Sequence, residues 1–248
     1  MHLSTKTGCL LLFLLALSRP DIKAQSPLPD SLIRDSAFSV ALQQYHEAVR
    51  PETNLYHGSQ YSDYHHSINT GHPYFIDSVI AGNIWYNGLR YPHVPLIYDL
   101  VLGLVVIKDP YGNWNIGLNS LQVDGFTVGD HFFIRLRDSL NPTAPRNGFY
   151  EQLHRGRVLL LKRETKFIQN DPSYLENRIE RYIEDVITFY VKKGDTYFPV
   201  NTKRSLALVL KERGRELNKF IRSNHLSFRK DKENTIVKVI SWYDPTDK

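Results

Sequence analysis

The sequence predicts an α+β protein: mainly an antiparallel β meander, forming an open or partly closed barrel, with one N-terminal helix and C-terminal helices. Three observations support this class. Apolar and polar residues alternate in short runs from about 74 to 161, Asn87-Gly88 separates two of these runs, and helical spacing of apolar residues occurs only near the two ends. Helices that gather at the ends, and do not alternate with strands, are typical of α+β folds.

The first 24 residues have the pattern of a secretory signal peptide. Lys6 gives a positive start, residues 9–17 are continuously apolar, and small or polar residues follow up to Ala24. Such a run covers about half of a ~30 Å hydrocarbon core, so it is too short to span a membrane. We expect cleavage after Ala24, export to the periplasm or cell exterior, and a flexible segment at 25–34. A buried N-terminal helix or strand is the alternative.

The composition excludes cysteine chemistry from the mature chain and predicts an uneven distribution of charge. Cys9 is the only cysteine and lies within the expected signal, so disulfides and thiolate sites are excluded. Residues 25–150 hold 7 basic and 11 acidic side chains, whereas residues 151–248 hold 21 and 14. We therefore expect one β-rich domain over 35–248 with a polarised surface and no transmembrane segment.

The N-terminal helix is expected over 35–50, where Asp35 or Ser36 can cap its start and Pro51 ends it. Residues 52–73 lack a clear period and predict mostly loop. Within residues 35–50 the apolar side chains fall on one helical face, formed by Phe38, Leu42, Tyr45 and Val49.

Strands are expected between Tyr74 and Leu161, and again in a hairpin from 183 to 200. Asn87-Gly88 is the strongest hairpin signal, because both residues adopt positive φ readily. Gly125 suggests a bulge, and Arg155-Gly156 a further turn. Residues 166–182 leave two possibilities open, a strand or a short helix that starts at Asp171-Pro172. The other expected turns lie at 109–113, 141–148 and 193–195.

The last part of the chain, about 203–243, predicts a helical cap. Gly214 marks a break in it or a close packing contact. Asp231 can cap a final helix, although β-branched residues after it leave a strand possible. The apolar stripe of the first part of the cap consists of Leu206, Leu210, Leu217, Phe220 and Ile221.

Tyrosines and histidines crowd the segment before the first long strand and predict ligand contacts. Tyrosine rings can stack on a sugar, and imidazoles can bind a divalent metal. His65 and His66 are adjacent and no metal-binding spacing occurs, so we assign no metal ligands. A solvated loop lying over the sheet is the alternative. The candidate ligand residues are Tyr56, His57, Tyr61, Tyr64, His72, Tyr74 and Asp99.

The chain holds no specific catalytic motif. It has no G-x-S-x-G, P-loop or G-x-G-x-x-G sequence, so we assign no catalytic residue and no cofactor. A glycosidase would need two carboxylates about 5–9 Å apart on one face. The carboxylates in or beside the expected strands are Asp77, Asp99, Asp124, Asp130 and Glu151.

Basic residues on the helical cap predict a surface for an anionic partner, such as a phospholipid, another envelope component or an acidic protein. A solvated outer face of packed helices is the alternative. No nucleic-acid-binding motif is present, so we expect no nucleic-acid partner. The candidate surface residues are Arg213, Arg215, Lys219 and Arg222.

Several short stretches resemble a family of uncharacterised exported proteins of Bacteroidota. The resemblance covers most of the mature chain, and it implies export but no known activity. The end of the signal, Lys23-Ala24-Gln25, is similar too. The other stretches are NLYHG at 54–58, GHPYF at 71–75, WYNG at 85–88, LIYD at 96–99, GFYE at 148–151 and WYD at 242–244.

Together these patterns predict a non-catalytic exported protein that binds an unknown small ligand or an envelope component. One alternative is a hydrolase of envelope glycans or peptides with a His and carboxylate site, and another is a metal-binding module. The binding protein predicts an apolar pocket or a flat basic face. The hydrolase instead predicts convergence among His57, His65, His72, Asp77 and Asp99.

Overall fold

The computed structural model describes residues 52–64, 68–109, 112, 114–137, 141–173 and 178–245. Contacts divide the chain into a unit of residues 1–47 and a unit of residues 48–248, and every described residue belongs to the second. The expected signal, the flexible segment at 25–34 and the helix at 35–50 lie outside the described residues, as does His65.

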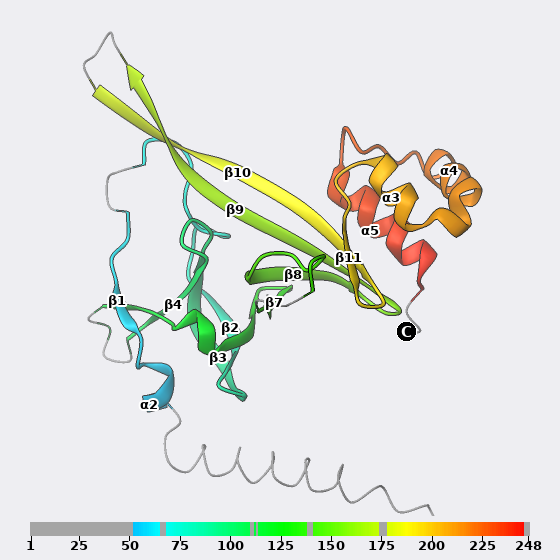
Figure 1. Ribbon diagram of the computed structural model, residues 1–248. Coiled ribbons are helices and arrows are strands. Elements are labelled where there is room, and N and C mark those ends of the chain that lie inside the picture. The colour runs from blue at the N-terminus through cyan, green and yellow to red at the C-terminus, as the bar shows by residue number, and fades with distance from the viewer. Residues whose placement is uncertain are drawn as a thin grey trace, which may run out of the picture. The chain divides into compact units, whose positions relative to one another are not determined.

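Within the described residues, eleven strands form one antiparallel sheet that is followed by helices (Figure 1). The spatial order is β1-β5-β4-β3-β2-β6-β7-β8-β9-β10-β11, which leaves β1 and β11 as edges. The sheet is therefore open and not a closed barrel, and the predicted antiparallel, β-rich class with C-terminal helices is confirmed. The strands are β1 (Ser59–Tyr61), β2 (Ile80–Tyr86), β3 (Leu89–Asp99), β4 (Leu104–Lys108), β5 (Asn115–Gly117), β6 (Val123–Val128), β7 (His131–Leu136), β8 (Gly148–Arg155), β9 (Val158–Ser173), β10 (Arg178–Lys193) and β11 (Thr196–Pro199).

The helical cap follows the sequence signals closely. Gly214 opens α4 directly after a short 3₁₀ turn, which is the predicted break. The Asp231 side chain accepts the backbone N–H of Asn234 at 3.1 Å, so residues after it form a capped helix and not a strand. The helices are α2 (Glu52–Leu55), η1 (Ser120–Gln122), α3 (Lys203–Val209), η2 (Lys211–Arg213), α4 (Gly214–Ser223) and α5 (Lys232–Tyr243).

The β2–β3 hairpin confirms the strongest turn signal. Asn87 and Gly88 have φ values of 52° and 76°, the left-handed region that a two-residue hairpin turn requires. The expected bulge falls one residue earlier than Gly125. Trp85 pairs with Gly125, and the next residue, Tyr86, pairs with Val123, so Asp124 is the extra residue of β6.

The structure decides between the two possibilities left open for residues 166–182. Up to residue 173 the segment is a strand and not a helix, because its backbone pairs with β10 as the end of a long strand. In β7 the buried residue is Phe133, while its neighbours Phe132 and Ile134 are partly exposed. The Phe133 ring stacks on Phe126 at 4.8 Å, so the odd positions of β7 face the core.

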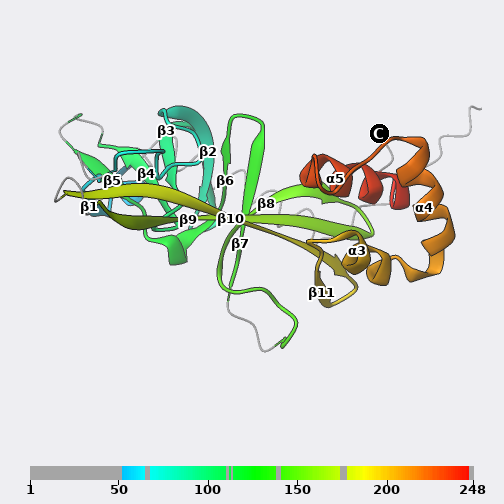
Figure 2. The same cartoon turned by 90° about the horizontal axis from the view of Figure 1, so that it is seen from above.

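The buried apolar residues form two clusters. The first lies among β2 to β8 and includes Ile84, Tyr98 and Phe126. The second lies between the helical cap and the ends of β9 and β10, beside which the helices lie in Figure 2. Burial of these two clusters supplies the main favourable free energy of folding. The second cluster includes Val158, Leu160, Phe189, Val191, Leu206, Leu210, Leu217, Ile236, Val239 and Ile240.

Candidate functional site

Four of the seven candidate ligand residues meet around Asp99, which has no exposed surface. Asp99 Oδ2 accepts hydrogen bonds from the hydroxyls of Tyr61 at 2.8 Å and Tyr64 at 2.9 Å. The Tyr61 hydroxyl also lies 3.5 Å from that of Tyr74. We call these four residues the Asp99 cluster. The crowding of tyrosines before the sheet thus reflects a real convergence in space.

The other oxygen of Asp99 shapes the turn after β3. Oδ1 accepts the backbone N–H groups of Val101 at 2.8 Å and Leu102 at 2.9 Å. The buried carboxylate therefore has four donors, which offset the cost of removing its charge from water. The cluster fixes the β3–β4 turn, so its first role is to position backbone.

The tyrosines of the cluster remain donors over a wide pH range. Burial, the hydrogen bonds and the Asp99 charge raise the pKa of Tyr61 and Tyr64 far above the ordinary value of about 10. Burial is also the main cause of the raised pKa of Tyr74. The Tyr61 and Tyr64 hydroxyls therefore stay protonated and donate to Asp99 throughout the physiological range.

The remaining candidates do not reach Asp99. Tyr56 packs against the first core cluster, and His57 is exposed. The His72 carbonyl accepts a hydrogen bond from Lys166 at 3.1 Å, and Nδ1 of the same histidine is buried without a partner. Among the described residues no hydrogen bond joins His57, His72 or Asp77 to Asp99. The described part of the chain also holds no group of three or more His, Cys, Asp or Glu that could bind a metal.

A pocket of about 280 Å³ opens where β8 and β9 separate. Strands β8 and β9 are paired from Arg155 and Leu159 to Glu151 and Lys162. Past this point the pocket is lined by residues 147–149 on one side and residues 163–165 on the other. Leu102 of the β3–β4 turn adds a further wall. The backbone N–H of Lys166 donates to the carbonyl of Leu100 at 3.1 Å, so this turn is fixed beside β9. The Asp99 carboxylate accepts the backbone N–H of Leu102, so it stabilises the turn that supplies this wall of the pocket.

Two guanidinium groups line this pocket, and we call it the arginine pocket. Arg135 donates to the Asn147 side chain at 2.9 Å and to the carbonyl of Ser120, and it lies 5.3 Å from the Phe149 ring centroid. These contacts fix the orientation of its planar group on one side of the opening.

Arg163 is fixed on the other side. It donates to the Tyr150 hydroxyl at 3.0 Å and lies 5.4 Å from the centroid of the same ring. It forms no ion pair with any described residue. Gly148 has a φ of 146°, and a Cβ there would lie 3.4 Å from Arg163 Nη2, so glycine suits both the backbone and the close approach.

Among the described residues that line the pocket, two carry guanidinium groups and one carries a carboxylate. Glu164 is the carboxylate among the lining residues, and it lies 3.5 Å from the buried ammonium of Lys162. Burial raises the pKa of Tyr98, another wall residue, although the nearby charge of Arg163 acts in the opposite direction. The charge of Arg163 thus acts on the Tyr98 hydroxyl against the charges of Asp99 and Glu164, which raise its pKa.

The sequence did not point to Arg135 or Arg163. They lie on different strands, they belong to no motif, and single arginines in alternating runs are usually solvated. Gly148, before a strand with two aromatic residues, was the nearest signal of a close approach.

Three of the four residues of the predicted anionic-partner surface lie on one exposed face of α4. Arg215, Lys219 and Arg222 are exposed at the spacing of one helical face. Arg213 contacts the cap itself, because it bonds to Glu216 at 2.8 Å and lies 4.6 Å from the Trp242 ring centroid. The binding of an anionic partner to this face stays a prediction.

The fold and the site define a class, an open antiparallel sheet with a helical cap and a two-arginine pocket between splayed strands. Comparison of the chain with protein-family models, with curated proteins and with solved structures finds no match. No helix among the described residues is long and apolar enough to cross a membrane. The resemblance to exported proteins of Bacteroidota stays a prediction.

Proposed function

We propose that this chain is an exported, non-catalytic binding protein that takes a small organic anion into the arginine pocket. The observation that carries the proposal is the convergence of Arg135 and Arg163 on one opening between β8 and β9. A guanidinium presents parallel donors that match a carboxylate or a phosphate, and both groups are already oriented by their neighbours. Prior orientation lowers the entropy lost on binding.

The rest of the lining fits the carbon part of such a ligand. Leu102 offers exposed apolar surface, and the buried rings of Tyr98 and Phe149 back the lining beside the guanidinium groups. The volume of about 280 Å³ is just below the range of small-molecule pockets, about 300–1,000 Å³, so the ligand must be small. A small organic acid or a phosphate monoester is the ligand class that this combination supports. Export follows from the signal pattern that ends at Ala24.

Isothermal titration calorimetry of the mature chain tests the proposal. The ligands are benzoate, phenylacetate, succinate and phenyl phosphate, with benzamide as the neutral analogue. We expect at least one anion to bind and benzamide not to bind. Arg163→Gln should weaken that binding about 10-fold or more, because one charged hydrogen bond contributes about 1.5–3 kcal/mol.

Arg90→Gln is the matched control for this experiment. Arg90 also lies near an aromatic ring, 5.8 Å from the Trp85 centroid, and bonds to an asparagine, but it is exposed on β3 and lines no part of the arginine pocket. Its loss should leave affinity unchanged. The proposal is wrong if no anion of the panel binds, or if Arg163→Gln binds as tightly as the unaltered chain.

A further inference from the structure

A second pocket, of about 460 Å³, lies between two hairpin turns. Arg155 and Arg157 line it from the β8–β9 turn, and Lys192 lines it from the end of β10. Its lining includes no carboxylate. We call it the tip groove. It shares no lining residue with the arginine pocket, and its remaining wall includes Ile134, Gln152 and Leu159.

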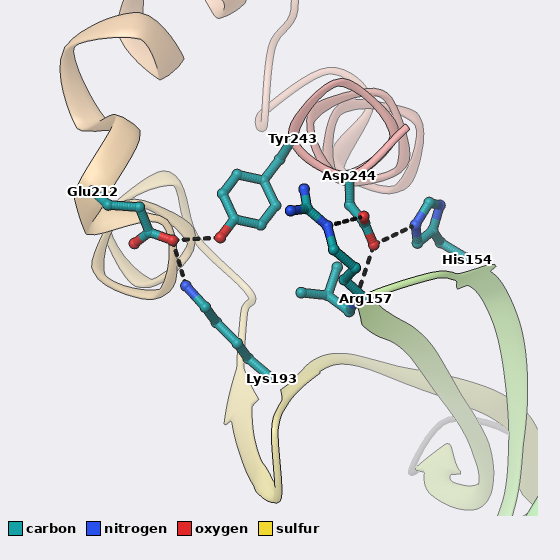
Figure 3. A network of polar contacts seen from close by, with 7 residues as sticks. His154, Arg157, Lys193, Glu212, Tyr243 and Asp244 are labelled. Atoms are coloured by element: carbon teal, nitrogen blue, oxygen red, sulfur yellow. Dashed lines mark hydrogen bonds and ion pairs between the residues drawn. The ribbon is translucent and has the colours of Figure 1, made fainter. Parts of the chain in front are cut away.

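Arg157 is oriented by a buried carboxylate, as Figure 3 shows. Arg157 Nε donates to Asp244 Oδ1 at 3.0 Å, and the side chain of Asp244 is only 3% exposed. The Arg157 side chain is 79% exposed. Because the bond uses Nε, both terminal nitrogens of the guanidinium stay accessible as donors; neither forms a hydrogen bond with a described residue.

Asp244 also fixes the turn that carries Arg157. Its Oδ2 accepts the backbone N–H of Val158 at 2.8 Å and lies 3.3 Å from His154 Nε2. A Cβ on Gly156 would overlap Asp244 Oδ2, so the turn packs directly on the carboxylate. The arginine therefore projects from a backbone that is itself held in place.

On the other side of the tip groove, the residue before Asp244, Tyr243 at the end of α5, helps to fix the end of β10. The hydroxyl of Tyr243 and the ammonium of Lys193 both donate to Glu212 Oε1 (Figure 3). These bonds lower the pKa of Glu212 to about 2, so the carboxylate stays charged. Two consecutive residues, Tyr243 and Asp244, thus anchor the two turns that border the groove.

Two of the three cations, Arg155 and Lys192, make few side-chain contacts that stabilise the fold. Arg155 is exposed, and its side chain forms no hydrogen bond or ion pair with a described residue. Lys192 lies 5.5 Å from the Tyr197 ring centroid and 3.9 Å from Asp195, whose side chain is fully exposed to solvent. Such an exposed pair contributes little and is readily exchanged for a ligand.

From this arrangement we infer that the tip groove is a binding site for a multiply charged anion that carries phosphate or carboxylate groups. The three cations offer charge, and Arg157 offers paired donors at a preset angle. The inference does not depend on the arginine pocket, because it uses other residues on other turns.

Calorimetric titration with pyrophosphate and with citrate, at constant ionic strength, tests the inference. We expect at least one of them to bind, and the stronger one identifies phosphate or carboxylate as the preferred chemistry. The double variant Arg155→Gln/Lys192→Gln should weaken binding about 10-fold or more, which corresponds to the loss of one charged hydrogen bond. Arg157→Lys keeps the charge but loses the paired donors, so it should weaken binding as well.

The matched control removes two exposed charges elsewhere, in Arg229→Gln/Lys230→Gln, and should bind as the unaltered chain does. Arg163→Gln should also leave pyrophosphate binding unchanged, which separates this site from the arginine pocket. The inference is overturned if neither anion binds, or if the control double variant loses as much affinity as Arg155→Gln/Lys192→Gln.

Discussion

Single residues determine how closely the turns approach the helical cap, and Gly156 is the clearest case. Alanine there would place a Cβ in overlap with Asp244 Oδ2 and 3.1 Å from His154 Nε2. Both neighbours are buried, so neither can move away without losing hydrogen bonds. We expect Gly156→Ala to lower the free energy of unfolding by about 2 kcal/mol, measured by urea denaturation.

Gly214→Ala is the control for Gly156→Ala. No atom lies within 4 Å of a Cβ built at Gly214, whose φ of −59° is helical. Alanine is the better helix former, so this change should leave stability equal or raise it by up to about 1 kcal/mol. A loss at residue 214 as large as that at residue 156 would contradict the steric argument.

At the scale of elements, Asp244 makes the attachment of α5 to the β8–β9 hairpin dependent on pH. Burial alone would raise the pKa of Asp244, but hydrogen bonds from Val158 and Arg157 outweigh it and lower the pKa. A carboxyl group whose pKa is lower in the folded than in the unfolded protein stabilises the folded state. Its full contribution is present above the unfolded-state pKa, about 3.9, and is lost as the pH falls through the folded-state pKa.

Asp244→Asn should therefore lower the free energy of unfolding by about 2 kcal/mol at pH 7 and by progressively less below pH 4. Chemical denaturation at a series of pH values from 7 to 2 measures this difference. A difference that stays constant over the whole range would show that the charge of Asp244 contributes nothing to the attachment.

Elements whose signals are local could be predicted from the sequence. Asn87-Gly88, Gly214 and Asp231 each mark a turn, a break or a cap, because φ preference and capping act over only a few residues. The long β9–β10 pair could not be predicted. Asp171-Pro172 is a local turn or helix signal, and pairing along sixteen residues of β9 with β10 overrides it.

At the scale of the whole molecule, the site was predictable only in part. Tyr61, Tyr64, Tyr74 and Asp99 were singled out by crowding and do meet, but none of them lines the arginine pocket. The arginine pocket depends on where β8 leaves β9, and this point is set by long-range pairing and not by any motif. The same limit applies to the tip groove, which needs two hairpins and the end of α5 in one place.

A charged network centred on the buried side chains of Lys162 and Glu151 connects α5 to the sheet. Lys162, whose side chain is 9% exposed, lies 2.9 Å from Glu233 of α5, 3.4 Å from Glu151 of β8 and 3.5 Å from Glu164. Glu151 in turn lies 2.5 Å from His131 Nδ1, and the His131 ring packs on Phe75 beside the first cluster. Burial would lower the pKa of Lys162, but its bond to Glu233 and the nearby carboxylates raise it. The lysine therefore stays charged.

Removal of this cation should destabilise both clusters together. Lys162→Met leaves the buried Glu151 without its ammonium, and we expect a loss of about 3 kcal/mol. Lys162→Met/Glu151→Gln should recover part of it, because the uncompensated charge is gone. Two variants that each keep a single tryptophan follow the unfolding of each region by fluorescence. Trp242 lies next to the second cluster, and Trp85 lies on β2. Both midpoints should fall by the same amount. A shift seen only by Trp242 would mean that the network stabilises the helical cap alone, and that the two clusters unfold independently.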